Sequence, residues 1–364
     1  MGWEGTMKKS LRALTALLLL LVVAGGAAML FQRPIGLWLY QRGLDSQAGR
    51  DSLAKLPDGL HVGLCGTGSP LPNRDRAGAC TVVIAGKAMF VVDAGEGGAR
   101  NIALMGLPNG EIRALFLTHY HSDHIDGLGP MMLLRWTGSG NKSPLPVYGP
   151  TGIEAVVGGF NAAYAADNGY RTAHHGPVIT PPAAAGATAM PFAVPTGPVV
   201  VYAAGGLKVT AFPVDHHPVQ PAVGYRFDYK GRSVVISGDT AKSPMVEAMA
   251  KGTDLLIHEA LQPEMLLMLA ARLKVTGRPQ TAQIMHDILD YHASPAQAAE
   301  SAETAHVKML VLTHIVPPYP MRYLDAAFLG DAKSKFAGPL IVGEDGDSYS
   351  LPAGSDAITR GNWF

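Results

Sequence analysis

Three histidines and an aspartate lie within residues 119–124 of the stretch Leu117-Thr118-His119-Tyr120-His121-Ser122-Asp123-His124-Ile125-Asp126-Gly127. The apolar residues before it predict a short buried strand, at whose end His119 and His121 lie on one side because side chains alternate. Asp123 and His124 then begin the next helix and can face the same point. Zinc and similar ions bind imidazole nitrogens and carboxylate oxygens. A single histidine is usually a core or surface residue, but this quartet predicts a metal site.

More candidate ligands follow apolar stretches downstream. Asp215-His216-His217 follows residues 211–214, Ser237-Gly238-Asp239-Thr240 follows residues 233–236, and Thr313-His314 follows residues 309–312. Ligands of layered α/β folds collect at strand ends. Asp239 alone could be a turn carboxylate, but in this order the segments complete a site for two metals.

Composition excludes several classes of protein. The chain has 364 residues, 29 Lys+Arg, 29 Asp+Glu and 48% hydrophobic residues. A disordered chain would be less hydrophobic and more highly charged, and a general nucleic-acid binder would show a basic excess. Two cysteines cannot form a disulfide scaffold or a zinc site built from cysteine alone.

The pattern resembles the metallo-β-lactamase fold superfamily, and most closely its ribonuclease Z-like branch, which includes arylsulfatase-like and phosphodiesterase-like members. The resemblance covers most of residues 60–350 and implies an α/β fold, an αββα sandwich of two sheets covered by helices. The matching motifs are Gly66-Thr67-Gly68-Ser69-Pro70, Asp93-Ala94-Gly95-Glu96-Gly97, Thr118 to His124, Ser237-Gly238-Asp239-Thr240, Asp254 to Ala260 and Leu312-Thr313-His314. The stretch Ile257-His258-Glu259-Ala260 points to the ribonuclease Z-like branch.

The resemblance implies a ligand set for two divalent metal ions. One metal would take His119, His121 and His216, the other Asp123, His124 and His314, and Asp239 would bridge both. His216 is preferred to His217 because the family pattern has Asp-His at this point. Asp93 would orient the metal loop, although it could equally be a turn residue. Zinc is the expected metal, and manganese or iron also fits these donors.

The implied chemistry is hydrolysis through water activated by the metals. In this branch Asp123 would also accept the proton of the attacking water. Glu259 and His292 match a paired glutamate and histidine that protonate the leaving oxygen. Either could instead be structural, Glu259 as an ordinary carboxylate and His292 as a polar residue in a turn between helices.

The sequence departs from the transfer-RNA processing enzymes of this branch. Those enzymes carry a long RNA-gripping arm between the ligands matching His216 and Asp239, where this chain has room for two strands and a turn. The net charge is zero, without a Lys/Arg-rich stretch to follow a phosphate backbone. We therefore expect a phosphodiesterase that acts on a small ester rather than transfer RNA, and no nucleic-acid partner. A homodimer would be consistent with the resemblance.

Other functions remain open at this point. Sulfate-ester hydrolysis, as in the arylsulfatase-like members, is the closest alternative. Lactone or β-lactam hydrolysis is a third, although the Glu259 and His292 match favours a leaving group that needs protonation. A non-catalytic, metal-stabilised binding module at the cell surface would be expected to have lost ligands, and here every ligand position is filled.

The N-terminus predicts export. Lys8, Lys9 and Arg12 precede an uncharged run from Ala13 to Phe31, which is long enough to cross a bilayer and would leave the basic end in the cytoplasm. The alternative is a cleaved signal peptide with its cut at residues 24–28. We expect residues 1–31 as signal anchor or signal peptide, 32–58 as a stalk and 59–355 as the hydrolase domain. The hydrolase would face the periplasm or cell exterior, or be secreted.

Two further groups of residues each allow two interpretations, and two other segments predict local structure. Cys65 and Cys80 could pair in an oxidising compartment or be two separate buried thiols. Arg171, His174 and His175 could contact an anionic substrate or belong to a solvated loop. Residues 177–198 are rich in Ala and Pro and predict an exposed loop, whereas Ser294 and Pro295 predict the start of a helix.

Overall fold

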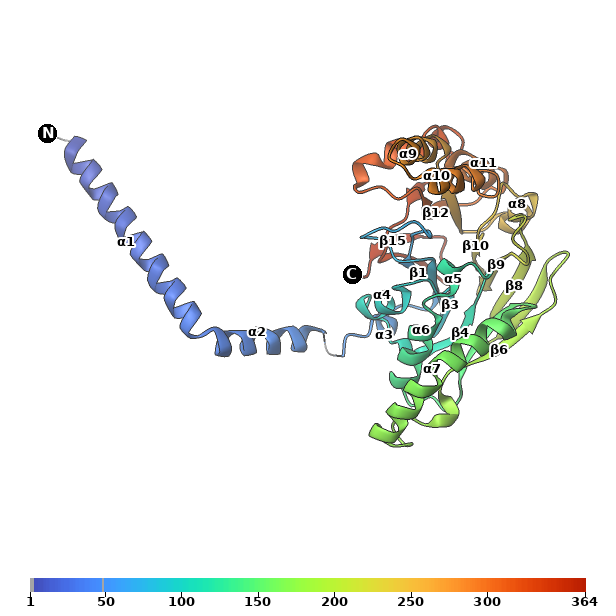
Figure 1. Ribbon diagram of the computed structural model, residues 1–364, viewed down its shortest axis with the longest axis horizontal. Helices are drawn as coiled ribbons and strands as arrows, with labels where there is room; N and C mark the ends of the chain where they lie inside the picture. The colour runs from blue at the N-terminus through green and yellow to red at the C-terminus, as the bar shows by residue number, and fades with distance from the viewer. Residues whose placement is uncertain (1–2, 48) are drawn as a thin grey trace. The chain divides into compact units, whose positions relative to one another are not determined.

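The computed structural model describes residues 3–47 and 49–364 (Figure 1). The chain divides into two units, one ending at Arg50 and one from Asp51 to Phe364. The first contains the helices α1 (Trp3–Leu30) and α2 (Gln32–Gln47). Within α1, the segment Met7–Leu30 is long and apolar enough to cross a membrane, and its most apolar 18-residue window has a mean hydropathy of 2.5.

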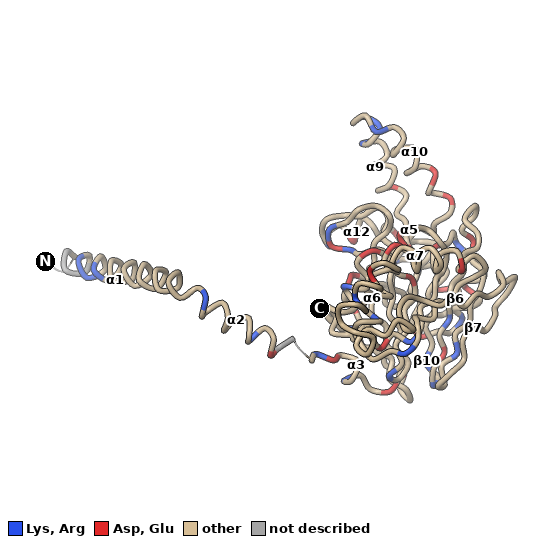
Figure 2. Tube along the Cα trace, turned by 60° about the horizontal axis from the view of Figure 1, so that its bottom comes forward, with Lys and Arg blue, Asp and Glu red and all other residues tan. Residues whose placement is uncertain are grey.

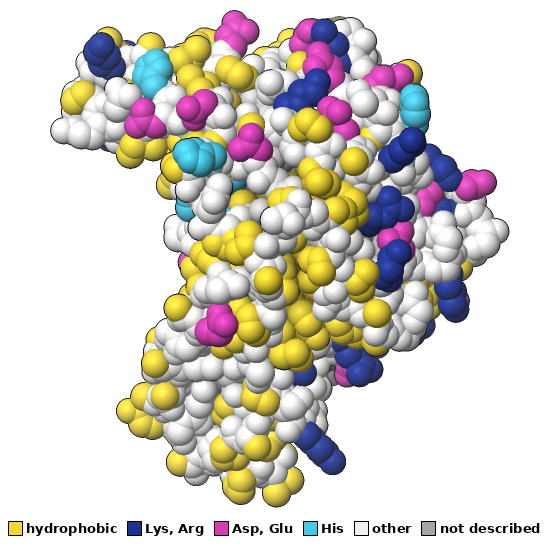
Figure 3. Space-filling view, turned by 90° about the vertical axis from the view of Figure 1, so that its right-hand side faces the viewer, with side chains coloured by type: hydrophobic (Ala, Val, Ile, Leu, Met, Phe, Trp, Pro, Cys, Tyr) yellow, Lys and Arg dark blue, Asp and Glu magenta, His cyan; other side chains and the backbone are white. Residues whose placement is uncertain are grey.

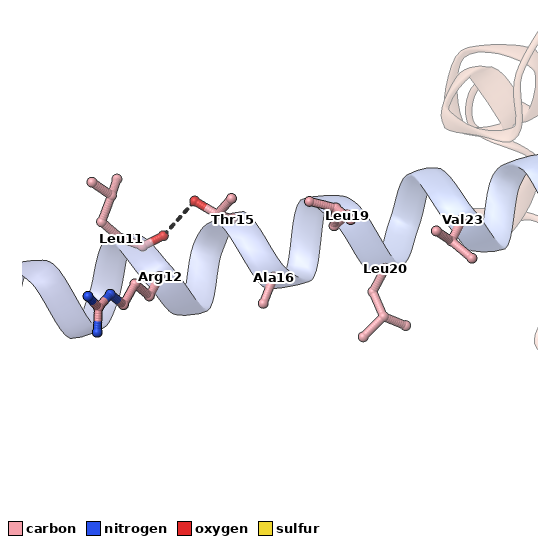
Figure 4. A pocket seen from close by; sticks show the side chains of 7 residues that line it. All are labelled: Leu11, Arg12, Thr15, Ala16, Leu19, Leu20 and Val23. Atoms are coloured by element: carbon pink, nitrogen blue, oxygen red, sulfur yellow. Dashed lines mark hydrogen bonds between the residues drawn. The ribbon is translucent and has the colours of Figure 1, made fainter.

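The apolar side chains of α1 are exposed along its length. Leu19, Leu20 and Val23 are more than half exposed, and Figure 4 shows them pointing outward from the helix. Thr15 is accommodated because its hydroxyl donates a hydrogen bond to the Leu11 carbonyl at 2.9 Å (Figure 4). This is the side-chain arrangement expected of a helix whose surroundings are apolar.

The second unit is built on two sheets. Among the described residues, one sheet has eight strands in the order β15-β14-β1-β2-β3-β4-β5-β6 and the other seven in the order β13-β12-β11-β10-β9-β8-β7. The first contains β1 (Gly59–Gly66), β2 (Cys80–Ala85), β3 (Ala88–Val92), β4 (Ile112–Phe116), β5 (Leu145–Pro150), β6 (Ala187–Phe192), β14 (Asp347–Pro352) and β15 (Thr359–Asn362). The second contains β7 (Val199–Ala204), β8 (Leu207–Pro213), β9 (Val223–Tyr229), β10 (Arg232–Ile236), β11 (Leu255–Leu261), β12 (Met309–Val316) and β13 (Leu340–Val342).

Each sheet has a parallel half. Strands β3 to β6 pair in parallel in one sheet, and β10 to β13 do so in the other. The parallel strand β11 is buried at every position, as expected of strands covered on both faces. Because parallel strands end at the same edge, the residues at their carboxyl ends gather in one place.

Helices flank both sheets, and most of them cover the outer faces. They are α3 (Ser52–Lys55), α4 (Gly98–Leu104), α5 (Ser122–Ile125), α6 (Leu128–Thr137) and α7 (Ile153–His175), then α8 (Pro244–Ala250), α9 (Pro263–Val275), α10 (Pro279–Asp287), α11 (Pro295–Thr304) and α12 (Asp325–Leu329). The aromatic residues Phe116, Tyr225 and Phe227 pack between the sheets. Separate cores lie under α4, α6 and α7 and under α8, α11 and α12. The predicted αββα sandwich, preceded by an apolar helix, is confirmed.

The α9–α10 hairpin (Pro263–Asp287) stands out from this sandwich. Figure 2 shows the two helices projecting from the body, with Lys and Arg near the tip. The hairpin is inserted between β11 and α11, and α11 begins as predicted, with Ser294 as its N-cap and Pro295 in its first turn. The Ser294 hydroxyl accepts a hydrogen bond from the Gln297 amide at 3.2 Å.

Several boundaries differ from those expected. The exposed loop predicted over 177–198 is wrong for residues 187–192, which form β6, and Pro191 is tolerated because β6 is an edge strand. Residues 51–58, assigned to the stalk, lie in the second unit, where Lys87 Nζ donates to the Leu56 carbonyl at 2.7 Å. Residues 359–362, beyond the expected end at 355, pair with β14.

Two other features concern the first sheet. Cys65 and Cys80 form a disulfide that joins the end of β1 to the start of β2. At one edge of this sheet lies β6, which precedes β7 of the second sheet in the sequence, and in this region Met190, Val194 and Val200 are exposed. Figure 3 views the molecule from the side on which β6 lies in Figure 1 and shows hydrophobic side chains gathered across the middle of that face.

Candidate metal centre

His119, His121, Asp123 and His124 lie in the loop after β4 and the first turn of α5. Thr118 and His119 are fully buried after β4, and Asp123 and His124 lie in the first turn of α5. The loop after β3 packs closely against them. A Cβ added to Gly95 would lie 2.4 Å from the Asp123 carbonyl oxygen, so only glycine allows the two loops to approach this closely.

Donor atoms from four separate segments converge here. One group combines His119, His121 and His216 with Asp239, a second combines Asp123, His124 and His314, and within each group the donor atoms lie within 4.8 Å of one another. His119 Nε2 is 3.0 Å from His121 Nδ1. Tetrahedral coordination at about 2.1 Å places donor atoms roughly 3.4 Å apart, so this spacing fits a metal ion.

Asp239 lies between the two groups. Its Oδ2 is 3.3 Å from Nε2 of both His124 and His314, and 3.8 and 4.0 Å from Nε2 of His119 and His216. Nε2 of His124 and of His216 is buried without a hydrogen-bond partner. Buried polar atoms rarely go unpaired in proteins, and a metal ion at each group would satisfy both nitrogens.

Hydrogen bonds on the far side of two rings fix their orientation. Asp93 Oδ2 is 2.9 Å from His124 Nδ1 and also accepts from the Thr118 hydroxyl at 2.9 Å. His216 Nδ1 lies 2.9 Å from the Tyr291 carbonyl oxygen and donates to it. Such partners hold the ring so that Nε2 faces the centre. His217, the alternative to His216, is exposed.

The electrostatics of the centre suit a cation. Burial alone would lower the pKa of His314, but the Asp239 and Asp123 carboxylates raise it to about 9. Burial likewise opposes the charge of His124, and Asp239, Asp123 and Asp93 raise its pKa well above the usual value. Desolvation instead lowers the pKa of His119 well below its usual value. The carboxylates therefore favour positive charge at this point, whereas His119 is a neutral donor.

Comparison with known proteins identifies the family. Residues 89–315 match the family described as a β-lactamase superfamily domain. The ribonuclease Z of Mycobacterium bovis (strain BCG / Pasteur 1173P2) is 37% identical over 296 residues, which cover 79% of this chain and 96% of the relative. This chain belongs to the metallo-β-lactamase superfamily. The match places it, as the motifs predicted, in the ribonuclease Z-like branch.

Solved structures share the fold of this superfamily member. The metallo-β-lactamase fold protein YhfI from Bacillus subtilis aligns with a TM-score of 0.58 and 20% identity, over 80% of this chain and 100% of that one. Human tRNase Z, short form, aligns with a TM-score of 0.56 and 21% identity, over 80% and 99%.

Membership of the family has two consequences. The chain is a metal-dependent hydrolase of the phosphodiesterase-like kind, and its fold implies divalent metal ions. The name ribonuclease Z describes an enzyme that cleaves RNA, and it weighs against our expectation that nucleic acid is not a partner.

Beside the ligands of this metallo-β-lactamase domain lies a buried acid–histidine pair. Glu259 Oε1 is 3.1 Å from His292 Nδ1, and it accepts hydrogen bonds from the Ala293 amide at 2.9 Å and the Thr240 amide at 3.2 Å. The ligating atom of His292 lies within 4.8 Å of those of Asp239 and His314. The ring is thus positioned to exchange a proton with a group bound at the centre.

A cavity of about 220 Å³ opens onto the centre of this hydrolase. It is lined on one side by His121, Asp123, Asp239, His292 and His314, and on the other by residues of α10 and of the loop after β1. Arg171, His174 and His175 are not among its lining residues. They lie near the end of α7, where Arg171 pairs with Asp167 at 2.7 Å.

Sequence reasoning missed the backbone groups that orient these side chains. The Tyr291 carbonyl and the amides of Thr240 and Ala293 carry no signal in the sequence, because every residue has the same backbone groups. Tyr291 also packs edge-on against His216, with ring centroids 4.5 Å apart. Only its position next to His292 could have suggested this contact.

Proposed function

We propose that this chain is a two-metal phosphodiesterase that acts on a substrate other than transfer RNA, held at the outer face of a membrane by α1. The ligand assignment is part of the proposal. His119, His121 and His216 would hold one ion, Asp123, His124 and His314 the other, and Asp239 would lie between them. Zinc is the metal we expect, on the basis of the donor set.

The observation that carries the choice of substrate is the connection between β9 and β10. Only Lys230 and Gly231 separate the two strands. This is the segment between His216 and Asp239, where transfer-RNA processing enzymes of this branch would carry their arm. Without an arm, RNA binding would depend on basic residues around the cavity. Among the described residues, none that lines the cavity is Lys or Arg.

The chain's own residues supply the proton transfers. When bound, the ions would supply activation of a water molecule and stabilisation of charge on the phosphoryl oxygens. The Asp123 carboxylate would accept the proton of the attacking water. His292, oriented by Glu259, would donate a proton to the leaving oxygen. The water oxygen would bond to phosphorus as the P–O bond to the leaving alcohol breaks, which gives a phosphomonoester and an alcohol. Asp123 would then release its proton to solvent, and His292 would regain one.

The proposed location rests on two observations. Met7–Leu30 forms a helix long and apolar enough to span a bilayer, with Lys8, Lys9 and Arg12 near its N-terminal end. The Cys65–Cys80 disulfide is of a kind that persists in oxidising compartments. Both favour a hydrolase domain exposed to the periplasm or cell exterior.

The test is an assay of the full-length protein in detergent, loaded with zinc or manganese. Bis(p-nitrophenyl) phosphate and a transfer-RNA precursor with a 3′ trailer are the two substrates, and Asp239→Ala controls for contaminating enzymes. We expect diester turnover that is lost in the variant, and no processing of the precursor. Accurate removal of the trailer would instead establish RNA processing. A protein that holds two metals without diester turnover would redirect the search to sulfate esters and lactones.

A further inference from the structure

The cavity beside the metal centre has two walls of opposite character. One wall carries the candidate ligands and His292. The other is apolar, with Pro70 beside Leu71, Ile284, Met285, Ile288, Tyr291 and Val316. A site that recognised a second phosphate or a sugar would need cations or polar groups on this second wall. Apart from the ligand side, the cavity's polar lining groups are Ser69, Ser122 and the Tyr291 hydroxyl.

The apolar wall is continuous with a packed hydrophobic core. Met285 and Val316 are buried in a small core with Leu261, Leu266 and Ala270, and Leu71 and Ile288 pack against that core. The wall therefore joins the base of the α9–α10 hairpin to β11 and β12. A wall continuous with a packed core keeps its shape without a ligand, so substrate binding need not order it.

One large apolar side chain remains open to solvent at this wall. Ile284 is 52% exposed although it lines the cavity. The cations of the hairpin, Arg272, Lys274 and Arg278, belong to its tip, and none of them lines the cavity. The apolar wall therefore favours removal of apolar groups from water, at roughly 25 cal/mol per Å², and among the described residues it presents no Lys or Arg to a polyanion.

We propose that the substrate is a phosphodiester in which one of the two esterified alcohols is apolar, a single aromatic ring or a short alkyl chain, bound against Ile284, Ile288 and Tyr291. This inference rests on the proposed phosphodiesterase function and narrows it to a substrate class. The scissile phosphorus would lie on the ligand side of the cavity, and the apolar group on the α10 side.

The test is binding of two phosphinates that cannot be hydrolysed, because their phosphorus–carbon bonds replace the ester bonds. Methyl(phenyl)phosphinate and dimethylphosphinate have the same charge and differ only in the apolar group. Isothermal titration calorimetry would use the full-length, metal-loaded protein in lipid nanodiscs. We expect the phenyl compound to bind about tenfold more tightly, as burial of several apolar carbons implies. Equal affinities would overturn the proposal.

Variants of Ile284 and Met268 test whether the preference for the phenyl compound depends on this wall. Ile284→Gln makes the rim of the cavity polar and should reduce the preference for the phenyl compound roughly threefold, whereas Ile284→Leu should retain it. Met268→Gln is the control, because Met268 is 68% exposed on α9 and does not line the cavity. A phenyl preference that Ile284→Gln leaves unchanged, or that Met268→Gln reduces equally, would overturn the assignment to this wall.

The two proposals fail in different ways. Turnover of bis(p-nitrophenyl) phosphate together with equal phosphinate affinities would contradict the apolar site and leave the phosphodiesterase function standing. Selective binding of the phenyl compound without diester turnover would contradict the function and leave the apolar site standing.

Discussion

Glu259 Oε1 lies 3.1 Å from Nδ1 of His292, although the whole α9–α10 hairpin separates the two residues in the sequence. Glu259 is fixed because it belongs to the buried strand β11 and accepts two backbone amide hydrogen bonds. His292 is fixed because it lies in the short connection between the hairpin and α11, two residues before the N-cap Ser294. The carboxylate therefore holds one ring nitrogen and leaves the other to face the metal centre.

Replacement of His292 should slow the release of poor leaving groups. General acid catalysis contributes roughly 10²- to 10⁴-fold, so His292→Gln should lower kcat by that factor for a diester that releases phenol. It should have a much smaller effect on one that releases p-nitrophenolate, which needs no proton. The measurement is the dependence of rate on the pKa of the leaving alcohol, which should steepen in the variant.

The control is His286→Gln, because His286 is an exposed histidine near the end of α10. It should leave the dependence on leaving-group pKa unchanged. An equal loss for both leaving groups in His292→Gln would mean that His292 binds metal or shapes the site rather than donating a proton.

Asp239→Ala should disturb both metal positions at once. Its Oδ2 lies 3.3 Å from two candidate ligands of one ion and within 4.0 Å of two of the other. We expect the bound metal, measured by mass spectrometry of the purified protein, to fall from two ions per chain to one or fewer. The exposed Asp331→Ala serves as control. Full metal content in Asp239→Ala would exclude a bridging role.

Asp93→Ala should weaken metal binding without removing a ligand. The Asp93 carboxylate orients both His124 and Thr118, and loss of such a partner typically reduces metal affinity by roughly 10- to 100-fold. Asp93→Asn should lose less, because its amide oxygen can still accept the His124 proton and asparagine tolerates the positive φ of 60° found here. Competition with a chromogenic chelator measures the metal affinity of both variants. Unchanged affinity in Asp93→Ala would make Asp93 a turn residue.

Removal of the Cys65–Cys80 disulfide should lower the stability of the domain. The bridge spans 15 positions, and closing a loop of this length contributes about 3 kcal/mol to the free energy of unfolding. The double variant Cys65→Ser, Cys80→Ser should lose that amount in urea titrations followed by tryptophan fluorescence. A reductant should destabilise the parent protein to the same extent and leave the variant unchanged. A reductant without effect on the parent would indicate two free thiols.

Regular structure could be predicted where the pattern of apolar residues reflects burial. The buried strand β11 and the capped start of α11 carry such signals. Strand β6 does not, because only β5 pairs with it and its residues alternate little between buried and exposed. Strand β15 consists of exposed residues, so nothing but its pairing with β14 distinguishes it from a loop.

The convergence of donor atoms could be anticipated because the candidate ligands follow strands or, for His314, lie near the end of one, β12. The sequence could not show which group forms a hydrogen bond with the other nitrogen of each histidine ring, the one that faces away from the centre. Asp93 and the Tyr291 carbonyl meet His124 and His216 only after distant segments have packed. The apolar wall has the same origin, since Leu71, Ile288 and Val316 come from three separate parts of the chain.

The α9–α10 hairpin lies between Glu259 and His292, the two members of the buried acid–histidine pair. At its tip, residues 276–278 between the two helices and the residues next to them are exposed. Exposed loop tips are where proteins tolerate insertions best. Thr276 and Gly277 are therefore a natural place to graft a fluorophore site, an affinity tag or a loop from another hydrolase. Exchange of the tip would leave Glu259 and His292 in place, so a library of substrate preferences could be built on one unchanged candidate metal centre.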